Sequence, residues 1–105
     1  SKERISNMTN KEFEKFLNSA IGAMWKQGSS KTAFVLMCWL LFAWHDMEYA
    51  ESFQTTDKNI LAATNIKSRS ALRKAKKELE QAGLISYTPS NAFGGSTYRI
   101  MDMKG

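Results

Sequence analysis

The sequence contains very few of the residues on which several classes of protein depend. Its 105 residues include one cysteine, one proline and one histidine. A single cysteine, Cys38, cannot form an internal disulfide, so we expect the protein in a reducing compartment, the cytoplasm. One histidine and one cysteine do not supply the ligand set of a transition-metal site. We therefore expect neither a metal nor a cofactor.

Long hydrophobic runs are also missing. An apolar run from Phe34 to Trp44 has 11 residues, whereas a membrane-spanning helix needs about 20. It lies well inside the chain, unlike the apolar stretch of a secretory signal peptide. We interpret this run as a helix buried on most sides and expect no association with a membrane.

Motifs of common catalytic sites are absent as well. No Gly-x-x-x-x-Gly-Lys phosphate loop is present. Cys38 lies in an apolar run without a catalytic partner. His45 is close to Glu48 and Glu51, but we interpret these polar residues as the solvated end of a helix. We therefore expect no enzymatic activity.

What the sequence does have is a concentrated positive charge. The net charge is +5, and the window 67–77 contains six basic and no acidic residues: Lys67, Arg69, Arg73, Lys74, Lys76 and Lys77. Subtracting six from +5 leaves the other 94 residues at −1. The excess charge thus lies in one short segment, which favours a polyanionic partner.

Periodicity and capping residues predict a mainly helical chain that ends in strands. Thr9, with Glu12 as in a capping box, opens the first predicted helix, and Gly83 closes the last. A turn-rich segment, 89–96, separates the final strands. The predicted helices are Thr9–Lys26, Ser30–Met47, Asp57–Ala63 and Ser68–Ala82; Phe53–Thr56 is compatible with a strand, and Leu84–Thr88 and Thr97–Met101 form the hairpin.

This order of elements is that of a winged helix-turn-helix. The fold class is therefore α+β, mainly α with a small β-hairpin wing and an N-terminal helical arm. We expect the arm at 1–30 and the winged helix at 31–105, in a fragment of a longer protein. The helix 68–82 would lie in the major groove of double-stranded DNA.

The two sides of helix 68–82 differ in polarity. Helical spacing aligns Leu72, Ala75, Leu79 and Ala82, which predicts the side that packs on the core. Ser70, Arg73, Lys74, Lys77 and Gln81 lie opposite, with Arg69 and Lys76 at the margins. We assign Ser70, Arg73 and Arg69 to base edges, and Lys74 and Lys77 to phosphates. Ser68 suits a phosphate at the helix start. The alternative is an ordinary solvated helix face.

The hairpin is a second candidate for DNA contact. Asn91 and Gly94 lie at its predicted tip, where a glycine lets the backbone approach a phosphate or the minor groove, and Arg99 follows on the last strand. The alternative is a plain flexible hairpin. Phe93 is a DNA wedge, a partner contact or a core residue.

The segment 56–85 resembles the winged-helix core of many bacterial and phage proteins. It has a capped short helix, a Ser-Arg helix start and a Leu-x-x-x-Gly-Leu-Ile exit formed by Leu79–Ile85. Together with the helical arm and the aromatic-rich helix 30–47, it is most similar to the N-terminal domain of phage replisome organisers and DnaD-like replication initiators.

The resemblance implies origin recognition in phage or plasmid replication, in the cytoplasm of a bacterial cell. It also implies a missing C-terminal domain that contacts a helicase or helicase loader. A transcription regulator of the same fold and an oligomerisation module remain alternatives. The apolar side of the helix 9–26 suggests a homo-oligomer, and Trp25, Trp39 and Trp44 belong to the core or to a subunit interface.

Overall fold

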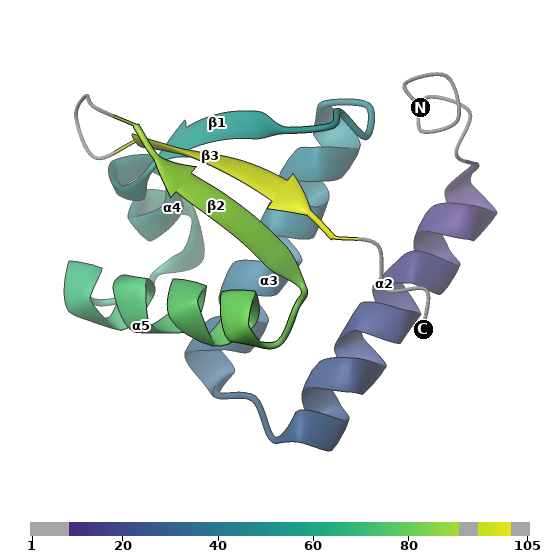
Figure 1. Cartoon of the computed structure of the whole chain (residues 1–105), viewed down its shortest axis with the longest axis horizontal. Coiled ribbons are helices and arrows are strands. Elements are labelled where there is room, and N and C mark those ends of the chain that lie inside the picture. The colour runs from purple at the N-terminus through teal and green to yellow at the C-terminus, as the bar shows by residue number, and fades with distance from the viewer. Residues whose placement is uncertain (1–8, 91–94, 102–105) are drawn as a thin grey trace.

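The computed structural model describes residues 9–90 and 95–101, and this part of the chain is mainly helical with one small antiparallel sheet (Figure 1). The α+β class is therefore confirmed, and every predicted element is present with its ends displaced by at most two residues. The helices are α2 (Asn10–Gln27), α3 (Lys31–Asp46), α4 (Asp57–Thr64) and α5 (Arg69–Gln81); the strands are β1 (Phe53–Thr56), β2 (Ile85–Pro89) and β3 (Gly95–Ile100).

Each helix begins at a hydroxyl-bearing cap. The side chain of Thr9 accepts a hydrogen bond from the Glu12 amide while the Glu12 carboxylate accepts one from the Thr9 amide, which completes the predicted capping box. Ser30, Thr56 and Ser68 each accept a bond from the amide three residues further on, at 3.1–3.2 Å. These bonds satisfy amides that have no partner inside the helix.

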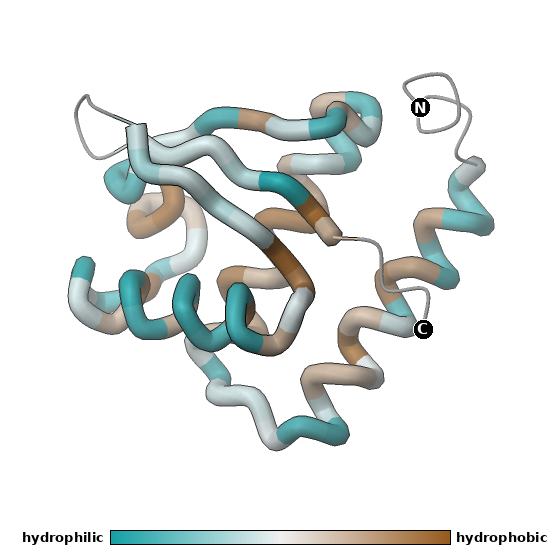
Figure 2. The backbone as a smooth tube through the Cα atoms, in the orientation of Figure 1, coloured by the Kyte–Doolittle hydropathy of each residue, from teal (hydrophilic) through white to brown (hydrophobic). Residues whose placement is uncertain are grey.

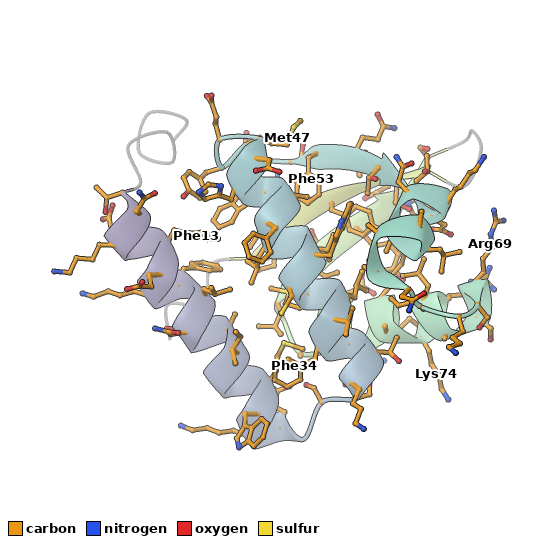
Figure 3. The ribbon with its side chains drawn as sticks, turned by 180° about the vertical axis from the view of Figure 1, so that it is seen from behind. Phe13, Phe34, Met47, Phe53, Arg69 and Lys74 are labelled. Carbon is orange, nitrogen blue, oxygen red and sulfur yellow. The ribbon has the colours of Figure 1, made fainter. Side chains whose placement is uncertain are left out.

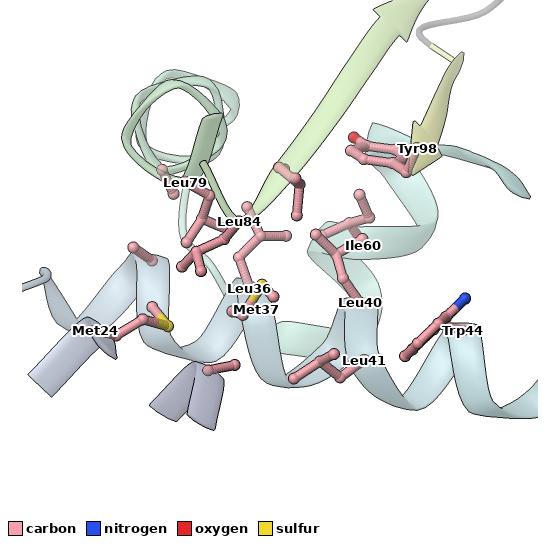
Figure 4. Packing of buried hydrophobic residues seen from close by; sticks show 14 of the residues in the cluster. Met24, Leu36, Met37, Leu40, Leu41, Trp44, Ile60, Leu79, Leu84 and Tyr98 are labelled. Atoms are coloured by element: carbon pink, nitrogen blue, oxygen red, sulfur yellow. The ribbon is translucent and has the colours of Figure 1, made fainter. Parts of the chain in front are cut away.

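The end of α5 explains the exit motif. Gly83 has φ of 79°, in the left-handed region, where glycine is favoured. The Gly83 amide donates to the carbonyl of Glu80, and the Leu84 amide donates to that of Leu79. This is the Schellman arrangement, in which the two leucines also pack together. Both are buried and lie side by side in Figure 4.

The core surrounds α3. Leu36, Leu40 and Leu41 of this helix are fully buried. Figure 4 places them among Met24 of α2, Ile60 of α4, Leu79 of α5 and Tyr98 of β3. Helices and strands from all parts of the described chain therefore bury their apolar sides against one central helix.

The sheet has three strands, one more than the predicted hairpin. Its order is β1-β3-β2, with both pairs antiparallel. Phe53 is in register with Tyr98, and their rings stack at a centroid distance of 6.0 Å. The hairpin also extends further than expected, because Pro89 and Ser96 pair across it. Pro89 is tolerated because β2 is an edge strand.

The helix α2 packs along α3 as an arm (Figures 1 and 3). Its contact is mainly aromatic: the ring of Trp44 lies 5.2 Å from that of Phe16 and 6.4 Å from that of Phe13. The Trp44 indole donates to the carbonyl of Ala50 at 2.9 Å.

Each helix of the described residues falls short of the length and apolar character that a bilayer crossing requires.

Candidate nucleic-acid interface

The two sides of α5 are as different as the sequence predicted. Leu72, Ala75 and Leu79 are buried against α3 and the sheet. The opposite side is exposed, and Figure 2 shows hydrophilic residues along most of this helix. We call its exposed basic residues the cationic face; they are Arg69, Arg73, Lys74 and Lys77. Ser70 and Gln81 are exposed beside them.

The cationic face is not neutralised by nearby carboxylates. Within residues 9–90 and 95–101, none of its four side chains makes an ion pair. Figure 3 shows Arg69 and Lys74 directed away from the body of the protein. Glu80 is exposed on the last turn of α5. The exposed acidic residue of α5 therefore lies at the far end of the helix from Arg69 and Arg73.

Glu78 does not weaken this face because it points to another helix. Its carboxylate accepts bonds from the backbone amide and the hydroxyl of Ser30, both at 2.8 Å. Ser30 is the N-cap of α3, where the partial positive charge of the helix favours an anion. This contact therefore joins α5 to the beginning of α3.

The prediction that Lys76 contacts DNA was wrong. The sequence placed it at the margin of the exposed face as a DNA contact, but its side chain is only 7% exposed. Its ammonium lies 2.7 Å from the Asp57 carboxylate and 5.4 and 5.5 Å from the ring centroids of Tyr87 and Tyr98. Because the side chain turns toward α4 and the sheet, Lys76 is not part of the cationic face.

The surroundings of Lys76 keep it charged. Burial by itself lowers the pKa of the ammonium, but the hydrogen bond to Asp57, the contact with Tyr98 and the charge of Asp57 outweigh burial, so the pKa is raised. Burial also raises the pKa of the Tyr98 phenol. Its oxygen is buried without a hydrogen-bond partner in the part of the chain that the structure describes. The site is thus a structural ion pair under two aromatic rings.

A groove lies between α5 and the turn end of the hairpin, where β2 ends and β3 begins. It has a volume of about 300 Å³. Its lining residues are Asp57, Arg73, Lys76, Lys77, Tyr87, Pro89, Ser90, Gly95 and Ser96. Arg73 and Lys77 form its outer, solvent-exposed side. Among the described residues Arg73 and Lys77 make no ion pair, whereas Lys76 and Asp57 of the same groove pair with each other. Two cations at the edge of a hollow suit a phosphate group.

The beginning of α5 carries the remaining predicted helix residues. Lys67 and Ser68 are both exposed. The Ser68 hydroxyl accepts a bond from the Ala71 amide at 3.1 Å, so its first role is that of a helix cap. Lys67 also lines a second hollow, of about 210 Å³, together with Lys31 at the start of α3.

The hairpin contributes fewer residues to the candidate interface than the sequence predicted. Arg99 is exposed, but side chains alternate along a strand and its neighbour Tyr98 is buried. Arg99 therefore points to the outer side of the sheet, where a nitrogen lies 3.9 Å from a Glu51 carboxylate oxygen. The structure does not bring it to the cationic face. Asn91 and Gly94, like Phe93, lie outside the described residues.

Other candidate sites acquire structural roles. His45 packs on Phe13 at a centroid distance of 4.9 Å and on Tyr49 at 5.5 Å. Within the described ranges, no group of three His, Cys, Asp or Glu residues is placed to hold a metal ion. Cys38 is half-buried, and burial raises the pKa of its thiol.

Comparisons with protein-family models, with curated proteins and with solved structures find no match to this chain. The case for a nucleic-acid interface therefore depends on the chain's own geometry, above all on the cationic face.

Proposed function

We propose that this chain is a winged helix that binds double-stranded DNA by inserting α5 into the major groove. The observation that carries the proposal is the cationic face, which is exposed, unpaired among the described residues and backed by the buried side of the same helix. The order α3, β1, α4, α5, β2, β3 and the sheet order β1-β3-β2 support the fold assignment. A groove of B-DNA about 12 Å wide accommodates such a helix.

The position of each side chain suggests its contact. Arg69, Ser70 and Arg73 lie on the first turns of α5, from which recognition helices reach base edges. Lys74 and Lys77 lie further along and suit phosphates on either side of the groove. The hollow beside Arg73 and Lys77 is placed to receive a phosphate between α5 and the hairpin. Lys67 extends the positive surface before α5.

The biological setting we propose is origin recognition during replication initiation in a bacterial or phage-infected cell, in the cytoplasm. The resemblance of segment 56–85 and the presence of a helical arm support this setting. A helicase or helicase loader would then be the protein partner, through a further domain. A transcription regulator would use the same α5 surface, and the identity of the selected DNA site separates the two.

The test removes charge from the cationic face without disturbing the core. We expect Arg73→Ala with Lys77→Ala to abolish most duplex binding, with little loss of stability because both side chains are exposed. The matched control is Lys11→Ala with Lys15→Ala, which removes the same charge from exposed positions of α2. Fluorescence anisotropy with duplex DNA, from about 50 to about 200 mM salt, measures both affinity and salt dependence.

Equal losses in the two double variants would show that only net charge matters and would contradict binding through α5. An unchanged affinity in the α5 variant would reject the proposal. Selection of bound sequences from random duplexes at near-physiological salt then identifies the preferred site.

A further inference from the structure

One side of α3 is apolar yet uncovered. Phe42 is 59% exposed and Val35 is 43% exposed, although both belong to the most hydrophobic helix of the chain. Trp39 and Cys38, between them, are only half-buried. In the view from behind, α3 lies in front of the sheet and no other described element crosses it (Figure 3), although Val35 also borders the hollow beside the turn between α4 and α5. A helix that is apolar on all sides is normally covered on all sides.

The position of this side rules out the arm as its cover. The apolar residues of α2 that are buried, among them Phe13, Ala20 and Met24, already pack within the chain. The buried residues of α3, such as Leu36 and Leu40, lie on the opposite side of the helix. Val35 and Phe42 are seven residues apart, about two helical turns, so they share one line along the uncovered side.

The uncovered side is also symmetric about its own middle. We call it the α3 outer face; its residues are Lys31, Val35, Cys38, Trp39, Phe42 and Asp46. Val35 and Phe42 are equally distant from the midpoint between Cys38 and Trp39, and so are Lys31 and Asp46. The two ends of the face therefore carry opposite charges at matching distances from its centre.

We propose that a second copy of this chain docks on the α3 outer face, with the two α3 helices antiparallel about a two-fold axis between Cys38 and Trp39. This pairing places Val35 of one copy opposite Phe42 of the other, in both halves of the interface. It also places each Lys31 near Asp46 of the other copy. Such self-complementarity is the property that a two-fold interface requires.

The proposed interface is small. A helix of 16 residues is about 24 Å long at 1.5 Å per residue, and one helix-to-helix contact of this length lies at the low end of protein interfaces. We therefore expect a dimer that dissociates at about micromolar concentrations. The apolar contacts supply most of its stability, while the paired charges select the antiparallel direction.

Sedimentation equilibrium of the protein over a wide concentration range tests the proposal. The native chain should pass from monomer to dimer, and Phe42→Glu should remain a monomer throughout. Trp25→Glu is the matched control, because Trp25 is an exposed aromatic residue of α2, 77% exposed, outside the α3 outer face. Phe42 is exposed in the monomer, so circular dichroism should show both variants folded.

Charge reversal tests the direction of the helices. Lys31→Glu and Asp46→Lys each bring like charges together in both halves, so each alone should weaken the dimer at least fivefold. An equimolar mixture of the two single variants should recover native dimerisation, because every charged pair is then opposite. Neither substitution should destabilise α3, because an acidic residue at the start of a helix and a basic residue at its end both interact favourably with the helix dipole.

Cys38 provides a direct probe of proximity. The two-fold axis brings the two Cys38 side chains to the same side of the interface, within reach of a short bismaleimide. Burial raises the pKa of this thiol, so the reaction is run at mildly alkaline pH. Cross-linked dimer should form in the native chain and not in Phe42→Glu. A concentration-independent monomer, or a dimer lost in Trp25→Glu and kept in Phe42→Glu, would overturn the proposal.

Discussion

Lys76 and Lys77 are neighbours in the sequence with opposite expected roles, and replacing each by methionine separates these roles. The Lys76 ammonium is 2.7 Å from Asp57 and its side chain is 7% exposed, whereas Lys77 belongs to the cationic face. We expect Lys76→Met to lower stability and leave DNA binding unchanged. We expect Lys77→Met to weaken DNA binding and leave stability unchanged. Methionine is chosen because it keeps the length and apolar stem of lysine.

The expected loss of stability depends on which charge each substitution leaves unpaired. Removing one member of a buried ion pair costs about 3–5 kcal/mol when the other charge stays buried. The Asp57 side chain is 21% exposed and lies in the first turn of α4, where helix amides favour an anion. We therefore expect about 1–2 kcal/mol for Lys76→Met. Asp57→Asn leaves the more enclosed ammonium unpaired and should cost about 2–4 kcal/mol.

The double variant Asp57→Asn with Lys76→Met should lose less stability than the sum of its parts, because neither charge then remains. Urea unfolding followed by circular dichroism gives the four free energies of unfolding. Duplex affinity is measured in parallel by anisotropy. Lys77→Met should reduce the slope of log affinity against log salt by about 0.9, the value for one phosphate contact. Lys76→Met should leave this slope unchanged.

The reasoning would be refuted by a Lys76→Met protein of native stability that has lost as much DNA affinity as Lys77→Met. Such a result would mean that the ammonium leaves Asp57 and reaches a phosphate. Additive energies in the double variant would separately refute the ion pair as a source of stability.

Three further predictions concern the surroundings of α5. Glu78→Ala should lower the free energy of unfolding by about 1–2 kcal/mol in urea titrations, because two charge-assisted bonds to Ser30 are lost, and it should not weaken DNA binding. Tyr98→Phe should change stability by less than about 0.5 kcal/mol or increase it, since the hydroxyl is buried without a partner in the described residues; a large loss would show a hidden bond. Both Lys76 and Tyr98 have a raised pKa in the folded protein, so their contribution is complete below the ordinary values of 10.5 and 10.0 and is lost as the pH rises above them. Unfolding measured from about pH 8 to 12 should therefore show declining stability above about pH 10.

Most of the helical architecture could be predicted because its determinants are local. A cap such as Thr56 or Ser68 bonds to an amide three residues away, and Gly83 ends α5 through its own backbone. Helical spacing also separated the buried side of α5 from its exposed side. These features depend on residues within one or two helical turns of each other, so they can be predicted from short stretches of the sequence.

The partners of Lys76 and Glu78 could not be predicted in the same way. Lys76 lies at the margin between the two sides of α5, and Asp57, 19 residues earlier, decides where its ammonium goes. Glu78 reaches Ser30 across 48 residues. Both contacts arise only after α3, α4 and α5 have packed, so spacing within α5 gives no sign of them.

Arg99 is a different case, because a local signal was present. Strand residues alternate between the two sides of a sheet, and an aromatic residue such as Tyr98 is the natural one to face the core. Its neighbour Arg99 must then face outward, away from α5. The third strand, by contrast, follows from long-range pairing of Phe53 with Tyr98, which β-compatible residues alone do not specify.

The bonds between Glu78 and Ser30 have a mechanical consequence. Only Gly28 and Ser29 separate the end of α2 from Ser30, so the arm and α5 are attached to almost the same point of the chain. A force that pulls the arm away from α3 acts on this junction and is transmitted to α5 through one carboxylate. A partner that binds the arm would therefore act close to the point where Glu78 attaches α5 to the start of α3.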